Sequence, residues 1–128
     1  MRQKNLEEMN LEKILFDKKL AVRSKVWFEL NDKPFLGEGR YAILSAIDRY
    51  GSIIKAAEET NVSYRRIRGV IREMEQAIGR KLVITFRGGK EGGGAVITEL
   101  AWELLLRFKK NDAAIRNVVD AIYQRIFK

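Results

Sequence analysis

Cysteine and histidine are both absent from the sequence. Without cysteine, neither disulfide bonds nor thiolate metal sites can form. Without histidine, the chain lacks the commonest general base and metal ligand, and it cannot build a Ser-His or Cys-His nucleophile. No pair of carboxylates has a spacing and setting that suggest acid–base catalysis. The sequence therefore predicts a protein that is not an enzyme and that holds neither a metal nor another cofactor.

Long apolar runs are missing as well. No run approaches the roughly 18 residues that a membrane-spanning helix needs. The N-terminus also lacks the apolar core of a secretory signal peptide. We therefore expect a cytoplasmic protein with no membrane partner.

Positive charge, in contrast, is abundant and unevenly distributed. The chain has 128 residues, enough for one domain with extensions, and a net charge of +8. Residues 63–90 hold eight basic and two acidic residues, a net +6 of that total. A sequence pI of about 9.9 and this concentration of charge favour a polyanionic partner.

Two amphipathic helical patterns meet at a very short connection between Gly51 and Gly79. The first runs from Ser52 to about Glu59, and its Ala56-Ala57 pair lets a second helix approach closely. The connection 60–62 has the length of a tight helix-to-helix turn. Ser63 then has the character of an N-cap, because its hydroxyl can accept a hydrogen bond from a free amide of the next turn.

The second helix carries apolar and basic residues on opposite sides. At about 100° per residue one side is apolar, formed by Ile67, Val70, Ile71, Met74 and Ile78. Arg65, Arg68 and Arg72 lie on the opposite side, and Arg66 lies on a flank. Duplex DNA offers such a row of guanidinium groups both phosphates and guanine acceptors. The alternative, a solvated basic face on an ordinary surface helix, is disfavoured by the preceding helix and tight turn, which together indicate a helix-turn-helix.

A strand, a basic glycine-rich loop and a second strand follow directly. The pattern predicts strands at 81–86 and 95–98, joined by the segment Arg87 to Gly94. This is the layout of a wing. Glycines let the backbone approach a phosphate closely, while Arg87 and Lys90 supply charge. A mobile loop in solvent is the alternative interpretation.

The last predicted helix runs from Glu99 to about Phe127, with Thr98 as its cap. An apolar stripe follows alternating steps of four and three and is interrupted only by Asp112; it consists of Ala101, Leu105, Phe108, Ile115, Val119, Ile122 and Ile126. Such a stripe suits pairing with a second chain, so we expect Leu105, Phe108, Ile115, Val119, Ile122 and Ile126 to mediate dimerisation. Folding back on the helix's own domain is the alternative.

Upstream of the helix pair the patterns are shorter. Residues 1–20 fit either a helix from about Asn5 to Lys19 or a partly ordered arm. Period-two alternation at 22–30 predicts a half-buried strand, which the turn at 31–34 and its proline should end. A helix at about 40–50 should follow, terminated by a glycine.

Several short motifs now appear in a characteristic order. They are Leu36-Gly-Glu-Gly-Arg40, Leu44-Ser-Ala-Ile47, Gly51-Ser52, Ala56-Ala57, Ser63-Tyr64, Arg72-Glu73-Met74, Leu82-Val83, Arg87-Gly-Gly-Lys-Glu-Gly-Gly-Gly-Ala95 and Ile97-Thr98. Over about residues 22–128 the chain resembles the N-terminal DNA-binding domain of the ModE family of molybdate-responsive regulators, which is related to the LysR-type winged helix.

The resemblance implies a mainly α fold with a small β wing, in which a winged helix-turn-helix is followed by a long C-terminal dimerisation helix. The domains expected are an extension at 1–21, the winged helix-turn-helix at 22–98 and the dimerisation helix at 99–128. Full-length family members continue into C-terminal oxyanion-binding domains, whereas this chain stops at Lys128. We therefore expect no molybdate sensing within this chain, and we identify no small-molecule effector.

The resemblance also implies that Ser63, Tyr64 and Arg65 open the recognition helix and that Arg87 to Gly94 form the wing. We expect a homodimeric, sequence-specific regulator of transcription bound to double-stranded DNA. Its base contacts are assigned to Arg65 and Arg68; its phosphate contacts are assigned to Ser63, Arg72, Arg87 and Lys90, and Tyr64 and Arg66 complete the DNA-binding set. A protein–protein adaptor that does not bind DNA, and a small enzyme using lysine or glutamate, are the alternatives.

Overall fold

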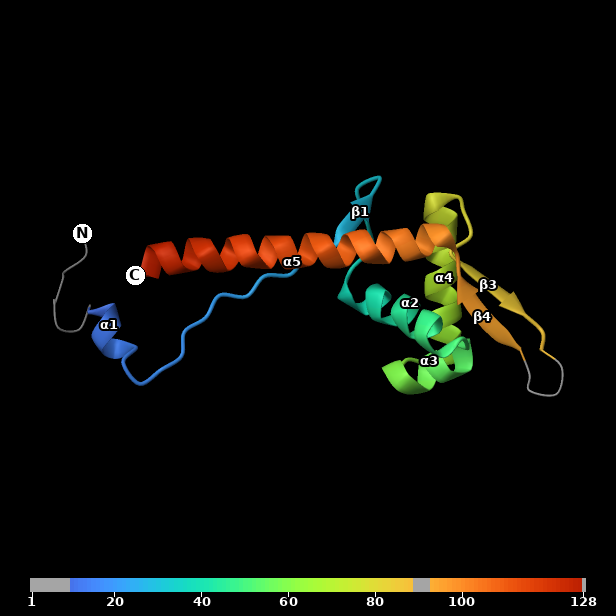
Figure 1. Ribbon diagram of the computed structural model, residues 1–128, viewed down its shortest axis with the longest axis horizontal. Coiled ribbons are helices and arrows are strands. Elements are labelled where there is room, and N and C mark those ends of the chain that lie inside the picture. Colours follow the sequence, from blue (N-terminus) through green and yellow to red (C-terminus); the bar gives the residue numbers. More distant parts are fainter. Residues whose placement is uncertain (1–9, 89–92, 128) are drawn as a thin grey trace. The chain divides into compact units, whose positions relative to one another are not determined.

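The computed structural model describes residues 10–88 and 93–127 (Figure 1). Its elements are α1 (Leu11–Ile14), β1 (Phe28–Leu30), β2 (Lys33–Leu36), α2 (Glu38–Tyr50), α3 (Ile53–Thr60), α4 (Tyr64–Ile78), β3 (Val83–Phe86), β4 (Gly94–Ile97) and α5 (Glu99–Phe127). The predicted mainly α fold with a small β wing and a long last helix is confirmed. The chain divides into two units, Lys25–Ile115 and a smaller one of Met1–Ser24 with Arg116–Lys128.

The core of the larger unit lies between α2, α3, α4 and the first turns of α5. Leu44, Ile47, Ile67 and Met74 are completely buried in it. Ala56 is also completely buried, so its small side chain permits the close approach of α3 that the sequence predicts. Apolar burial on this scale is the main stabilising contribution to such a unit.

The helix-turn-helix has the boundaries expected from its capping residues. Ser52 accepts a hydrogen bond from the Lys55 amide at 3.2 Å, and Ser63 accepts one from the Arg66 amide at 3.1 Å. Asn61 ends α3 in the left-handed conformation, with φ of 56°. Asparagine tolerates this conformation better than most residues, and it turns the chain at once into α4.

The β1–β2 hairpin differs from the sequence prediction. The predicted strand at 22–30 is reduced to three residues, Phe28–Leu30, and Pro34 does not end it but lies within β2, opposite Glu29. The turn is formed by Asn31 and Asp32, whose φ angles of 52° and 64° are those of a two-residue hairpin. Proline is tolerated because each strand of a two-stranded sheet is an edge strand and can have an amide position without a partner.

The smaller unit contains the short helix α1, which Asn10 caps by accepting a hydrogen bond from the Lys13 amide at 3.1 Å. The predicted helix at 5–19 is thus limited to Leu11–Ile14 within the described residues, and positions 5–9 lie outside them. At the other end of the unit, the Tyr123 hydroxyl donates to the Leu20 carbonyl at 2.9 Å. The Tyr123 ring also stacks on that of Phe127, with centroids 4.6 Å apart.

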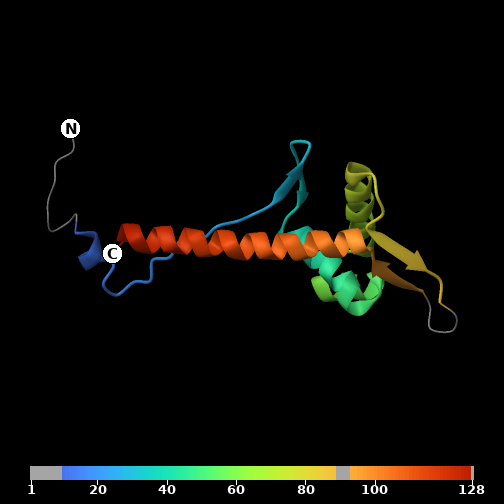
Figure 2. The same cartoon turned by 45° about the horizontal axis from the view of Figure 1, so that its top comes forward.

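The β3–β4 hairpin lies beside α4 in both ribbon views (Figures 1 and 2). Its strands pair in antiparallel register from Val83–Ile97 to Phe86–Gly94. β3 begins two residues after the predicted start and ends at the predicted Phe86, and β4 is shifted by one residue at each end. Residues 89–92 between them lie outside the described part. Among the described residues, no helix is both long and apolar enough to cross a membrane.

Candidate nucleic-acid interface

Helix α4 has a buried apolar face and an exposed basic face, as the sequence predicts. Ile67, Val70, Ile71 and Met74 form its buried face. On the other side Arg65, Arg66 and Arg72 are exposed, and Arg68 is half-buried. No ion pair within the described part of the chain engages any of these four guanidinium groups. The helix therefore presents four positive charges that are free to bind an anionic partner.

The acidic residues of the same helix are engaged elsewhere. Glu73 forms an ion pair with Arg40 of α2, with 3.0 Å between nitrogen and oxygen. Glu75 is engaged at the start of β3, where it makes the contacts described below. Within the described residues, neither carboxylate therefore forms an ion pair with the four arginines of α4.

Three hollows follow the basic face, and each is lined by two or three of the predicted site residues. Ser63, Arg65 and Arg66 line the first, near the start of α4. Arg68 and Arg72 line the second together with Lys81 of the segment before β3. Tyr64, Arg68 and Arg87 line the third, between α3, α4 and the wing. Arg68 is common to two of them, so it lies between the helix face and the wing.

The structure brings together seven of the eight predicted DNA-binding residues on α4, its cap and the wing. The eighth, Lys90, lies outside the described residues. Arg87 is exposed and directly follows β3. Lys81 is a basic residue of this surface that the sequence analysis did not assign to the site. In the sequence, only its positive charge and its position between α4 and β3 indicate that Lys81 lies on this surface.

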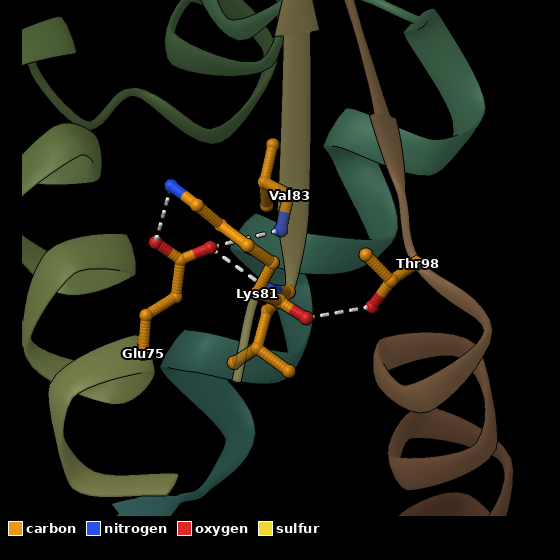
Figure 3. Close-up of polar contacts among 5 residues, drawn as sticks. Glu75, Lys81, Val83 and Thr98 are labelled. Atoms are coloured by element: carbon orange, nitrogen blue, oxygen red, sulfur yellow. Dashed lines mark hydrogen bonds and ion pairs between the residues drawn. The ribbon is translucent and has the colours of Figure 1, made fainter. Parts of the chain in front are cut away.

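A carboxylate contact joins α4 to the wing (Figure 3). Glu75 Oε2 accepts hydrogen bonds from the backbone amides of Leu82 at 2.8 Å and Val83 at 3.2 Å. Its Oε1 lies 3.7 Å from Lys81 Nζ. Hydrogen bonds to a charged acceptor are the stronger kind, and this side chain is only 16% exposed. The sequence analysis missed Glu75, because its partners are seven and eight residues away and nothing local indicates them.

Thr98 connects the segment before β3 to the start of α5. Its Oγ1 donates to the Lys81 carbonyl at 3.0 Å and accepts from the Ala101 amide at 3.2 Å, as a helix cap does. The Thr98 amide in turn donates to the Leu82 carbonyl at 2.9 Å. The base of the wing is therefore bonded to both α4 and α5 (Figure 3).

A further hydrogen bond attaches the wing to the helix-turn-helix at a point distant from the base of the wing. The Ala95 amide of β4 donates to the carbonyl of Gly51, in the turn between α2 and α3, at 2.9 Å. Together with the Glu75 contacts, this bond fixes the wing against the helix-turn-helix at two separated points. The distance between Arg87 and the arginines of α4 is thus set by tertiary hydrogen bonds and not by the hairpin alone.

Helix α5 divides the predicted dimerisation residues into two groups. Leu105 and Phe108 are buried in the core of the larger unit, where the Phe108 ring lies 5.2 Å from Phe28 and 5.4 Å from Tyr41 between centroids. The remaining four, which we call the distal stripe, are less covered: Ile115, Ile122 and Ile126 are exposed and Val119 is half-buried. Within the described residues, the apolar face available to another chain begins at Ile115.

Comparison with known proteins agrees with this arrangement. Residues 40–101, from α2 to the start of α5, match the family described as bacterial regulatory helix-turn-helix protein, lysR family. The molybdenum-pterin-binding protein MopB of Rhodobacter capsulatus is 33% identical over 86 residues, which make up 67% of this chain and 32% of MopB. The DNA-binding transcriptional dual regulator ModE of Escherichia coli K12 is 36% identical over 77 residues, or 60% of this chain and 29% of ModE.

The chain thus spans about a third of the length of these curated relatives. Among solved structures, ArgP from Mycobacterium tuberculosis has a TM-score of 0.47 at 24% sequence identity, over 67% of this chain and 30% of ArgP. The family match covers both helices of the helix-turn-helix and the whole wing. Residues 40–101 therefore resemble the lysR family of bacterial regulatory helix-turn-helix proteins, within a chain that is similar to the N-terminal part of ModE.

Proposed function

We propose that this chain binds double-stranded DNA and serves as the DNA-binding part of a transcriptional regulator. The observation that carries the proposal is the row of four unpaired arginines on α4, continued by Arg87 on a wing that is bonded to the same helix. In this arrangement α4 lies in the major groove, and the wing lies on the backbone or in the minor groove. The family assignment supports the same function.

Roles for the individual side chains follow from their place on α4. The first turns of a recognition helix reach the base edges, so Arg65 and Arg68 contact guanine O6 and N7. Arg72 lies later on the helix and Arg87 on the wing, where phosphates are the nearer partners. The Ser63 oxygen accepts the hydrogen bond of the cap, which leaves its O–H group available. This O–H group donates a hydrogen bond to a phosphate. Lys90 acts with Arg87 on the backbone.

A second copy of the chain completes the proposed regulator. The distal stripe would leave four β-branched side chains in water, and pairing it with the same stripe of another chain buries them. A two-fold dimer then presents two recognition helices to one side of the DNA.

The salt dependence of DNA binding tests the proposed function. We expect the logarithm of the binding constant for a mixed-sequence duplex to fall linearly with the logarithm of salt concentration, with a slope of about −0.9 per phosphate neutralised. Simultaneous replacement of Arg65, Arg68 and Arg72 by alanine should weaken binding and make the slope shallower by about 1 in magnitude, because only Arg72 of the three is assigned to a phosphate. A charge-matched variant with alanine at Lys18, Lys19 and Arg23, which are not among the proposed DNA-binding residues, should change the slope little. A protein–protein adaptor would show no measurable affinity and no salt slope.

A further inference from the structure

The hollow between the helix-turn-helix and the wing is lined by apolar, hydroxyl-bearing and basic residues. Its volume is about 510 Å³, and we call it the wing groove; it is lined by Ser52, Ile53, Ile54, Tyr64, Arg68, Thr85, Phe86, Arg87, Gly93 and Gly94. These residues come from the start of α3, the start of α4 and both strands of the wing. The groove therefore lies next to the proposed base-reading face of α4.

Large apolar side chains stand exposed along this groove. Ile54 is 63% exposed, Phe86 is 53% exposed and Tyr64 is 49% exposed. Such surface in water carries a cost that a bound partner can remove, and a cluster of this kind on a small domain marks an interaction site. The folded core does not require Ile54 to be apolar, since it lies on the outer side of α3.

The Phe86 ring is held in place by its surroundings. It lies against Gly94, where a Cβ atom would come within 2.6 Å of the ring. The same Cβ would lie 3.1 Å from the Gly51 carbonyl oxygen, so the ring is next to the turn that precedes α3. Phe86 is thus a preorganised wall of the groove, and its position depends on a glycine at 94.

The charged residues around the groove indicate which class of ligand can bind there. Arg87 borders it from the wing and Arg68 from α4, and among the described lining residues there is no carboxylate. Tyr64, Thr85 and Ser52 add hydroxyl groups. An occupant must therefore combine negative charge and hydrogen-bond acceptors with apolar faces of its own. A DNA strand has these properties, because phosphates alternate along it with the C–H faces of deoxyribose.

We propose that the wing groove holds the sugar-phosphate backbone of one DNA strand where it passes from the α4 contacts to the wing. Arg87 binds a phosphate, and Ile54 and Phe86 pack against the deoxyribose groups beside it. This inference rests on the proposed binding of duplex DNA and adds to it a component of affinity that does not depend on counterion release. Apolar burial gives that component, so salt leaves it nearly unchanged.

The test separates the two components by salt titration of single variants. The full chain is titrated with a mixed-sequence duplex of about 30 base pairs, long enough for two half-sites one helical turn apart. We expect Ile54→Ser and Phe86→Ser each to weaken binding about 5-fold at every salt concentration, with the slope unchanged. Arg87→Ala should instead make the slope shallower by about 1.

Val96→Ser is the matched control, since Val96 is 47% exposed on the same wing and does not line the groove. It should bind as the unmodified chain does. The inference is overturned if Ile54→Ser and Phe86→Ser bind as tightly as Val96→Ser, or if their loss of affinity comes with a shallower slope. In both cases the proposed function still stands, provided that the unmodified chain binds DNA with a steep slope.

An unmodified chain without DNA affinity overturns the proposed function and this inference together. Circular dichroism melting establishes whether each variant is folded. Should Phe86→Ser unfold, Ile54→Ser still decides the question, because the exposed Ile54 side chain contributes little to the core. Loss of affinity at constant slope in folded Ile54→Ser supports the inference, and unchanged affinity overturns it.

Discussion

Glu75 shows how one side chain can fix the position of the wing relative to α4. Its carboxylate accepts from two consecutive backbone amides at the entrance of β3. A backbone amide that loses its acceptor in a half-buried place costs about 1–3 kcal/mol. The residue should therefore act on the proposed DNA binding through position, because it holds the wing against α4.

Replacing Glu75 with alanine should lower the free energy of unfolding by about 2 kcal/mol, because the Leu82 and Val83 amides lose their acceptor. Glu75→Gln keeps one acceptor oxygen and should lose less. Urea denaturation at one fixed protein concentration measures both. The control is Glu73→Ala, whose 67% exposed carboxylate pairs with Arg40 and should be worth less than about 1 kcal/mol. Equal losses for Glu75→Ala and Glu73→Ala would contradict the structural role of Glu75.

Ser63 combines two roles that substitution can separate. Its oxygen caps α4, so Ser63→Ala should lower the free energy of unfolding by about 1 kcal/mol. Ser63→Asp keeps the cap acceptor and should leave stability nearly unchanged. Its carboxylate would, however, face phosphate, and we expect DNA affinity to fall at least about tenfold. Denaturation and DNA titration of the two variants check this, and an aspartate variant that binds DNA normally would place Ser63 away from the backbone.

At the scale of the element, α5 lies in two different environments along its length: its first turns are in the core, and its later turns are exposed. Ala101, Leu105 and Phe108 belong to the core of the larger unit, whereas the distal stripe has little covering within the described residues. One amphipathic helix thus packs into the core of the larger unit through its first turns, and we propose that its remaining apolar face contacts a partner chain. Steps of four and three residues keep that face aligned along the helix.

The double variant Ile115→Glu and Val119→Glu should convert the proposed dimer to monomers, because like charges would meet in the distal stripe. Light scattering gives the mass, and circular dichroism should show that the winged domain remains folded. A control with the same added charge on the other side of the helix, Asn117→Glu with Ala121→Glu, should stay dimeric. A stripe variant that remains dimeric would show that the chains associate through another surface.

At the scale of the whole molecule, charge and symmetry together set what the DNA site should look like. Residues 63–90 carry most of the net positive charge, and Arg68 of α4 and Arg87 of the wing border one surface between them. Two such surfaces, related by a two-fold axis through α5, would contact two half-sites in opposite orientation.

Selection of bound duplexes from random DNA should therefore return an inverted repeat. Its half-sites should lie about 34–36 Å apart, or a multiple of that spacing, so that both recognition helices reach the same side of the DNA. Sequencing of the selected pool measures the spacing directly. The monomeric stripe variant serves as the control and should select single half-sites. Direct repeats, or half-sites at random spacing, would rule out the proposed two-fold arrangement.

The sequence by itself determined the features that depend on local signals. The two-sided character of α4, the serine cap at 63, the threonine cap at 98 and the glycine end of α2 all follow from side-chain period and from short-range hydrogen bonds. The wing follows from two β-branched runs around a glycine-rich segment. These elements were predicted within a few residues because neighbours in the chain are also the interacting partners.

Only the tertiary structure decided the rest. Leu105 and Phe108 fit a dimer stripe by spacing, yet Phe108 meets Phe28 and Tyr41 from distant parts of the chain. Asn31 and Asp32 form a two-residue turn that carries Pro34 into a strand, a choice that depends on the pairing of β1 with β2. Spacing along one helix cannot tell a core face from a partner face, because both are equally apolar. Which surface covers such a face depends on residues far away in sequence, and these meet only when the chain folds.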